Sequence, residues 1–209
     1  MIDKQLLNDM LLNVARVLKD NEKELCVLDS DIGDGDHGVA MSKIARIIEK
    51  NCIDNTDSIK KCLDDIGLDI MSTVGGSSGM LWGSFFTGFS MNAPDKDTES
   101  ISDEQFKMMF NSAYEEMAIV TQAKVGDKTM MDAMIPAFNV IEESSGSYAV
   151  MLSEAAVAAR EGANKTKEYV AKYGRAKNLH ERAIGLIDAG AISTALVFEE
   201  MARVANKNI

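Results

Sequence analysis

The segment Leu28–Gly38 reads Leu28-Asp29-Ser30-Asp31-Ile32-Gly33-Asp34-Gly35-Asp36-His37-Gly38, with four aspartates, three glycines and one of the chain's two histidines. Asp34 and Asp36 flank Gly35, so a tight turn would direct both side chains to one point. Asp29 reaches the same point if the glycines let the chain reverse. Carboxylates ~4 Å apart repel by roughly 1–4 kcal/mol per pair. The cluster therefore requires a cation, and all-oxygen ligands favour Mg²⁺ or Ca²⁺ over zinc.

Two other interpretations of this segment compete with a metal site. Aspartate and glycine are common turn formers, so the segment could be a polar loop with helix caps, although it holds more acids than a turn requires. An EF-hand loop requires a glutamate at its twelfth position. Counted from Asp29 that position is Ala40, and counted from Asp31 it is Ser42. The EF-hand interpretation is therefore excluded.

The composition is that of a globular protein with a strongly acidic balance. The 209 residues suit one compact domain, residues 1–209, with 46% hydrophobic and 26% charged residues. The net charge of −11 argues against nucleic acid or an anionic membrane as the partner. Metal ions would then have to neutralise any phosphate that the protein binds.

The cysteines and the N-terminus bear on the location of the protein. The spacing of Cys26, Cys52 and Cys62 matches no metal or redox motif, which indicates thiols in a reducing cytosol. Residues 1–4 lack a basic region followed by an apolar core, so we expect no secretory signal. No apolar run approaches the ~20 residues needed to span a bilayer. These features together predict a cytoplasmic protein.

Apolar residues recur with helical spacing along most of the chain. The first helix should follow an Asp3 cap, the third a cap at Thr56 or Ser58, and a later one a capping box of Ser102 and Gln105. We expect the helices over residues 6–18, from about 38 to 48, 58–74, 80–91, 102–123, one kinked at Pro136 that ends near Gly146, 151–173 and 191–205.

About eight helices with short connections predict an up-and-down antiparallel bundle. Alternate connections of such a bundle lie at the same end. Four polar or glycine-rich breaks have this spacing along the chain, so they should gather at one end to form a site. They are the acidic segment, Gly75–Gly79, Gly126–Thr129 and Gly174–Gly190.

The second break, Gly75-Gly76-Ser77-Ser78-Gly79, opens a helix. Its free amides, the helix dipole and the serine hydroxyls would suit a phosphate, although close packing alone also explains such glycines. It is not a Walker A motif, because no Lys-Ser/Thr pair follows Gly79. Beside a carboxylate cluster, phosphate-binding amides favour a metal–nucleotide site.

Three basic or titratable side chains have open roles from sequence alone. His37 either donates to a phosphate oxygen, orients a metal ligand or is a polar loop residue. Arg175 either contacts a phosphate or a partner or is solvated. Little in the sequence supports a functional role for His180, which is interpreted as a surface residue.

Taken with the residues that follow them, the four segments resemble the dihydroxyacetone kinase L subunit family. The matching stretches are DSDIGDGDHG at 29–38, GGSSGMLWG at 75–83, GDKTMMD at 126–132 and GRAKNLHERAIGLIDAG at 174–190. They occur in order and cover the chain from near its start to its last helix. The resemblance implies an all-α fold, a closed eight-helix up-and-down antiparallel barrel, that binds ADP or ATP at one end through two Mg²⁺ ions.

The resemblance also implies roles for individual residues. Asp29, Asp34 and Asp36 match metal ligands of the family. The nucleotide-binding residues that it implies are His37 at a phosphate, Gly76, Ser77, Ser78 and Gly79 in the glycine-rich phosphate contacts, and Thr129, Met130, Gly174, Arg175 and Asp188, with Gly190, toward the base and ribose. The sequence departs from the family pattern at three positions. Asp31 stands where proline or another uncharged residue is common, Trp82 where tyrosine is common, and Ala189 where proline is common.

In this family the work is divided between subunits. A K subunit holds a short-chain ketose covalently through a histidine and the L part supplies the nucleotide, so the chain alone should not act on the ketose. Free-standing L subunits resemble the phosphotransferase-system version, in which a phosphocarrier M subunit regenerates ATP from bound ADP, whereas fused enzymes use exchangeable ATP. The sequence leaves these two donors open. A homodimer or hetero-oligomer is expected.

Two alternative functions are retained. The chain could be the nucleotide domain of a fatty-acid-kinase-like system, although His37 within GDGDHG favours the ketose-kinase branch. It could instead be a nucleotide-sensing regulatory module without chemistry.

Overall fold

The computed structural model describes residues 1–54, 58–96 and 100–207. Within these ranges the chain is helical, with one isolated antiparallel bridge between Ile2 and Ile101 and no strand. This confirms the all-α class. The helices are α1 Lys4–Asp20, α2 Glu22–Ser30, α3 His37–Asp54, α4 Ile59–Thr73, α5 Gly76–Met91, α6 Asp103–Val120, α7 Met131–Glu143, α8 Tyr148–Lys165 and α9 Ala189–Lys207, with the 3₁₀ helices η1 Thr166–Glu168 and η2 Arg175–Ala183.

Polar side chains begin three of these helices as the sequence predicts. Asp3 accepts a hydrogen bond from the Leu6 amide at 2.8 Å, and Ser58 caps α4 in the same way. Ser102 caps α6 by accepting from the Gln105 amide at 3.1 Å. The predicted capping box is only half formed, because the Gln105 side chain donates to the Asn92 carbonyl instead. The alternative cap at Thr56 lies outside the described residues.

The helix α2 was not predicted. The chain leaves helical geometry at Asn21, whose amide and side chain both bond to the Val17 carbonyl, and a new helix then runs to Ser30. No glycine or proline marks this bend, so the sequence gives no breaker signal there. Only Leu25 of α2 is buried. The acidic segment therefore begins inside a helix rather than after one.

Two helices end earlier than expected. The predicted end near Ala123 is wrong for α6, which stops at Val120 because Thr121 is extended. The predicted helix through Tyr173 is also wrong, since α8 ends at Lys165, where the Thr166 hydroxyl bonds to the Ala163 carbonyl and η1 follows. Because both helices end early, the segments after them are no longer α-helical and lie at the end of the molecule that holds the site. Pro136 lies inside α7, and the kink expected there stays a prediction.

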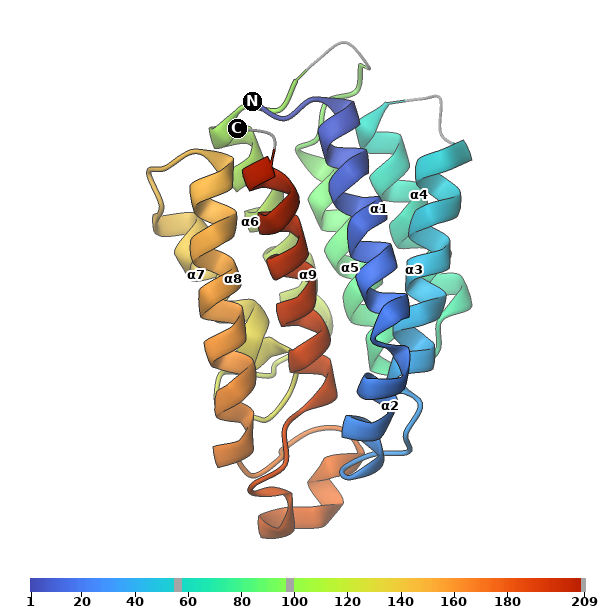
Figure 1. The fold of residues 1–209 in the computed structure, drawn as a ribbon, viewed down its shortest axis with the longest axis vertical. Helices are drawn as coiled ribbons and strands as arrows, with labels where there is room; N and C mark the ends of the chain where they lie inside the picture. The colour runs from blue at the N-terminus through green and yellow to red at the C-terminus, as the bar shows by residue number, and fades with distance from the viewer. Residues whose placement is uncertain (55–57, 97–99, 208–209) are drawn as a thin grey trace.

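The long helices run up and down beside one another along the long axis of the molecule (Figure 1). Helices adjacent in the chain pack together from α3 through α9, and α1 packs against both α3 and α9. The N-terminus and the end of α9 lie at one end of the bundle, whereas α2, the loop after it and η2 lie at the other (Figure 1). The second end is the one at which α3, α5, α7 and α9 begin.

A cluster of phenylalanines fills the space between the helices. Its members stack or meet edge to face, with ring centroids 4.8 Å apart for Phe89–Phe110 and 6.3 Å for Phe85–Phe138. They belong to α5, α6 and α7, and Phe198 joins them from α9. Such aromatic pairs add ~0.5–1.5 kcal/mol each beyond the area they bury. The core therefore holds α5, α7 and α9, whose N-terminal ends form the site, in a fixed relation.

Candidate metal and nucleotide site

A pocket of about 1070 Å³ opens at the end of the bundle where α3, α5, α7 and α9 begin. Its wall includes residues of all four breaks, among them Asp34, Ser77, Thr129 and Arg175. The predicted gathering of the four breaks is thereby confirmed. The volume of the pocket is slightly above the ~300–1,000 Å³ range that is typical of small-molecule sites. Four helix N-termini meet at this pocket, and the positive ends of their dipoles favour an anionic ligand.

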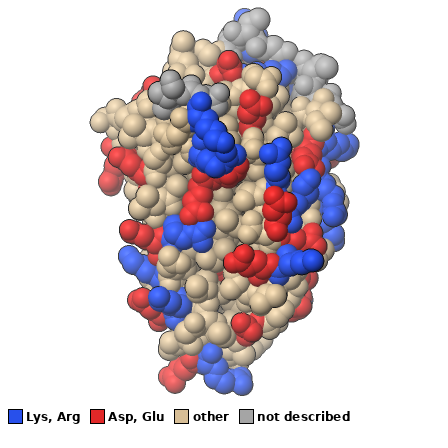
Figure 2. Space-filling view, viewed as in Figure 1, with Lys and Arg blue, Asp and Glu red and all other residues tan. Residues whose placement is uncertain are grey.

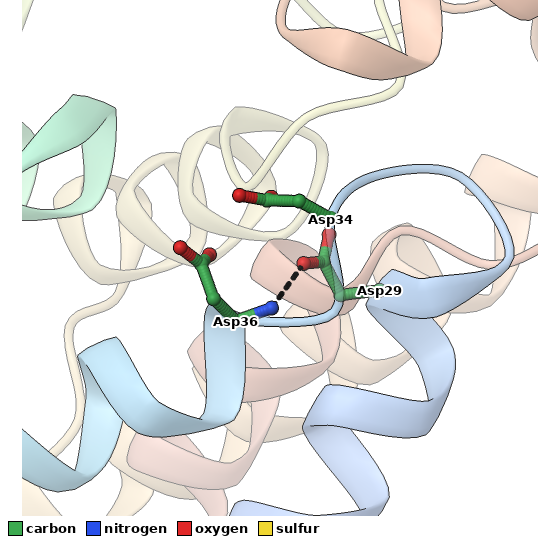
Figure 3. A group of neighbouring side chains, drawn as sticks. All are labelled: Asp29, Asp34 and Asp36. Atoms are coloured by element: carbon green, nitrogen blue, oxygen red, sulfur yellow. Dashed lines mark hydrogen bonds between the residues drawn. The ribbon is translucent and has the colours of Figure 1, made fainter.

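Three aspartates form one acidic group in the wall of the pocket. Asp29 comes from the last turn of α2, Asp34 from the loop and Asp36 from the residue before α3, and their carboxylate oxygens lie within 4.8 Å of one another. Figure 3 shows the three side chains and the bond that the Asp36 amide donates to Asp29 at 3.0 Å. Gly35 makes this turn with φ +75°, a conformation that favours glycine. Asp31 is exposed and outside the group, as the sequence suggests.

Electrostatic repulsion within the group is visible at Asp36. Burial, followed by the charges of Asp34 and Asp29, raises the pKa of Asp36, and Arg175 acts in the opposite direction. Arg175, from η2, forms an ion pair with Asp34. The cluster thus pairs with a cation of the chain, which is the behaviour expected of carboxylates that are suited to a metal ion.

The glycine-rich break divides into lining and packing residues. Gly76, with φ +74°, Ser77 and Ser78 line the pocket. Gly79 does not line it, and a Cβ there would overlap the Val74 carbonyl. Its glycine is therefore explained by the close approach of the chain before α5, and a phosphate contact from it stays a prediction.

His37 lies at the start of α3, with both ring nitrogens facing protein hydroxyls. Its Nε2 is 2.9 Å from Ser193 Oγ, and its Nδ1 is 3.5 Å from Ser78 Oγ. Burial lowers the pKa of His37, although the charge of Asp29 opposes the shift. No pattern in the sequence points to Ser193, because it lies 156 residues from His37 in the chain.

The remaining predicted residues also line the pocket, namely Thr129, Met130, Gly174, Arg175, Asp188 and Gly190. Asp188 caps α9 by accepting from the Ala191 amide at 2.8 Å, and burial raises the pKa of Asp188 to about 7. Asp132 accepts bonds from the amides of Gly126 and Thr129, so it fixes the turn that presents Thr129. His180 is exposed and does not line the pocket.

Lys128 is a residue of the pocket that the sequence did not single out. It lines the pocket but is 1% exposed, and its ammonium donates to the carbonyls of Thr166, at 2.6 Å, and Leu186. Burial lowers the pKa of Lys128, opposed by the charges of Asp188 and Asp132. Its backbone has φ +60°, which is rare for a residue with a side chain. A lysine inside a Gly-Asp-Lys-Thr break was the available signal.

The charge of the lining is close to balanced. Four carboxylates, Asp29, Asp34, Asp36 and Asp188, face three cations, Lys43, Lys128 and Arg175. The lining therefore offers no excess positive charge for a polyphosphate. Away from the pocket, acidic and basic side chains are interspersed over the face in Figure 2, without a continuous basic area among the described residues. None of the described helices is long and apolar enough to cross a membrane.

An all-helical bundle whose terminal pocket combines a carboxylate triad with helix N-termini is suited to bind a metal-chelated phosphate. Residues 31–203 match the model of the DAK2 domain, and the chain belongs to this family. The resemblance found in the sequence is thereby confirmed.

Individual relatives agree with this assignment. The chain is 35% identical over 201 residues to the ADP-binding subunit DhaL of PEP-dependent dihydroxyacetone kinase 2 from Listeria innocua, covering 92% of this chain and 91% of the relative. The corresponding DhaL of Escherichia coli K12 is 33% identical over 184 residues, covering 86% and 87%.

A solved structure has the same fold. The dihydroxyacetone kinase of C. freundii in complex with AMP-PNP and Mg²⁺ superimposes with a TM-score of 0.71 at 27% identity. The match covers 95% of this chain and 34% of that protein, so the chain spans about a third of its length.

Proposed function

We propose that this chain is the ADP- or ATP-binding, phosphoryl-transferring subunit of a dihydroxyacetone or short-chain ketose kinase, and that it acts with a separate K subunit. The observation that carries the proposal is the meeting of the Asp29, Asp34 and Asp36 carboxylates with four helix N-termini at one pocket. The DhaL relatives, which are named as ADP-binding subunits of such kinases, support it.

The donor set fits Mg²⁺, because three carboxylates supply only oxygen ligands and repel one another without a cation. We propose two Mg²⁺ ions, held by Asp29, Asp34 and Asp36 together with phosphate oxygens. Bound Mg²⁺ would neutralise charge on the transferring phosphoryl group. The C. freundii kinase complex, which contains AMP-PNP and Mg²⁺, supports this choice of metal and ligand class.

The chain's own residues would bind and orient the nucleotide. Gly76, Ser77 and Ser78 line the pocket at the start of α5, where the helix dipole favours phosphate oxygens. Arg175 is near enough to the triad to pass from Asp34 to a phosphate. Thr129, Met130, Gly174, Asp188 and Gly190 would enclose the adenosine. No residue of this chain would form a covalent bond with a substrate, because the ketose would be bound by the K subunit.

The binding experiment compares three substitutions in one loop. Asp34→Ala and Asp36→Ala should each abolish ADP binding in the presence of Mg²⁺, measured by isothermal titration calorimetry, with helical circular dichroism unchanged. Asp31→Ala is the matched control, because Asp31 is an exposed acid of the same loop outside the triad. Unchanged ADP affinity in Asp34→Ala and Asp36→Ala would refute the proposal.

Turnover separates the kinase from a sensor of nucleotides. The protein mixed with a related K subunit, ketose and Mg-ATP should form ketose phosphate, and neither protein alone should do so. Failure of the mixture would favour a regulatory module. Mass spectrometry of the purified protein then distinguishes the donors, since retained ADP supports regeneration by a phosphocarrier M subunit and an empty site supports exchangeable ATP.

We further propose that residues 1–209 are one domain, a closed eight-helix barrel. The circuit of packed neighbours from α1 through α3 to α9 and back to α1 supports closure, with α2 as an appendage. A single cooperative unfolding transition, coincident by fluorescence and circular dichroism, is the expected result. The cytoplasmic location and a homodimer or hetero-oligomer stay predictions from the sequence.

A further inference from the structure

Ser193 lies on α9, is fully buried, and links α9 to α3 beside the pocket. Its Oγ is 2.9 Å from Nε2 of His37, the first residue of α3, and 2.9 Å from the carbonyl of Gly190, to which it donates. A hydroxyl carries a single proton. When this proton points to the Gly190 carbonyl, Ser193 Oγ is left as an acceptor, and the bond between Ser193 and His37 is donated by the imidazole Nε2–H.

The other edge of the ring is then determined. A neutral imidazole has one N–H, so a proton on Nε2 leaves Nδ1 as an acceptor. Nδ1 faces the hydroxyl of Ser78 at 3.5 Å, and this hydroxyl becomes the donor. The hydrogen bonds therefore run in one direction, from Ser78 on α5 through His37 on α3 to Ser193 and Gly190 on α9.

We propose that Ser193 is a positioning residue of the nucleotide site, which holds His37 as the Nε2–H tautomer so that His37 in turn orients Ser78. This role rests on the function proposed above, because Ser78 belongs to the phosphate-binding turn. In this tautomer the only N–H of the neutral ring is bonded to Ser193, so the ring has no N–H left for a phosphate oxygen. His37 then affects phosphate binding only by orienting the Ser78 hydroxyl. The ring and the hydroxyl are thus oriented before a nucleotide arrives, which reduces the ordering cost of binding.

The neighbouring residue provides a matched control. Thr194 is also fully buried on α9 and donates to the same Gly190 carbonyl at 2.9 Å. No hydrogen bond joins it to His37 among those found in the described part of the chain. Ser193→Ala and Thr194→Val each remove one buried hydroxyl at the start of α9, but only the first removes the partner of His37.

The tautomer can be observed directly by ¹⁵N NMR of the imidazoles. The chain has two histidines, and the exposed His180 serves as an internal reference. In wild-type protein at pH 8, without nucleotide, His37 should show a protonated Nε2 and an unprotonated Nδ1. Thr194→Val should keep this pattern, whereas Ser193→Ala should give a mixture of tautomers. In Ser193→Ala the ADP affinity measured with Mg²⁺ should fall about tenfold, ~1.4 kcal/mol, with helical circular dichroism unchanged.

Three results would overturn the role of Ser193. They are a protonated Nδ1 in the wild-type ring, a Ser193→Ala protein with normal tautomer and normal ADP affinity, and an equal loss of affinity in Thr194→Val. A wild-type protein that does not bind Mg-ADP overturns the proposed function instead, so the two failures are distinguishable.

Discussion

Replacing Lys128 by methionine tests whether a buried lysine holds one wall of the pocket together. Lys128 is 1% exposed and joins two separate segments, since its ammonium donates to the carbonyls of Thr166 and Leu186. Methionine has a similar length but no donor. The substitution leaves two carbonyls without this partner and removes the positive charge that faces Asp188 and Asp132.

The magnitude follows from the bonds that are lost. A hydrogen bond to a charged group contributes roughly 1.5–3 kcal/mol, and breaking a buried charge network costs about 3–5 kcal/mol. Part of this loss is returned, because the ammonium no longer has to be desolvated; its lowered pKa reports that cost. We therefore expect Lys128→Met to reduce the free energy of unfolding by ~3 kcal/mol.

The assay is urea unfolding of the unliganded protein, followed by circular dichroism. Lys167→Met is the matched control, because Lys167 is an exposed lysine in η1, next to Thr166, and should leave the midpoint nearly unchanged. A loss below ~1 kcal/mol in Lys128→Met would refute the reasoning, since ordinary surface substitutions change stability by less than that.

Two further predictions concern stability. Asp188 has a folded pKa of about 7, above its usual value, so the folded state retains a proton that the unfolded state has lost. Its contribution is therefore fully present below about pH 4 and is lost as the pH rises to about 7, by up to ~1.4 kcal/mol per pH unit. Asp188→Asn should flatten that slope in urea unfolding of unliganded protein, and an unchanged slope would contradict the assignment. Separately, Gly162→Ala should lower the thermal midpoint at a cost of ~1–3 kcal/mol, because a Cβ there would overlap the Asp132 carbonyl. Asn164→Ala, on the exposed face of α8, is its control, and equal midpoints for both variants would exclude this close contact.

The architecture could be predicted because it depends on local signals. Apolar spacing located the long helices, and Ser58 and Ser102 marked their starts through bonds within a single turn. Counting helices then sufficed to bring four breaks to one end of the bundle. The helix α2 could not be predicted in this way. The bend at Asn21 has no glycine or proline, and the apolar pattern does not clearly change there.

The site was predictable only where its residues are neighbours in the chain. Asp29, Asp34 and Asp36 are joined by one turn, and their spacing alone suggested a cluster. The bonds from Lys128 to Thr166 and from His37 to Ser193 join residues that are 38 and 156 positions apart. Such contacts depend on how the helices are arranged around the phenylalanine core, and no local pattern encodes them.

The arrangement explains how a chain with a net charge of −11 can serve an anionic ligand. The charged side chains of the pocket nearly cancel, so the attraction for phosphate must come from groups that the net charge does not count. Each helix N-terminus contributes about half a positive charge, and α3, α5, α7 and α9 all begin at the pocket. An up-and-down topology supplies these four ends together, because every second helix starts at the same end. Under the proposed function, the carboxylate triad adds a requirement for metal, so that affinity for the nucleotide would depend on both the fold and the cation.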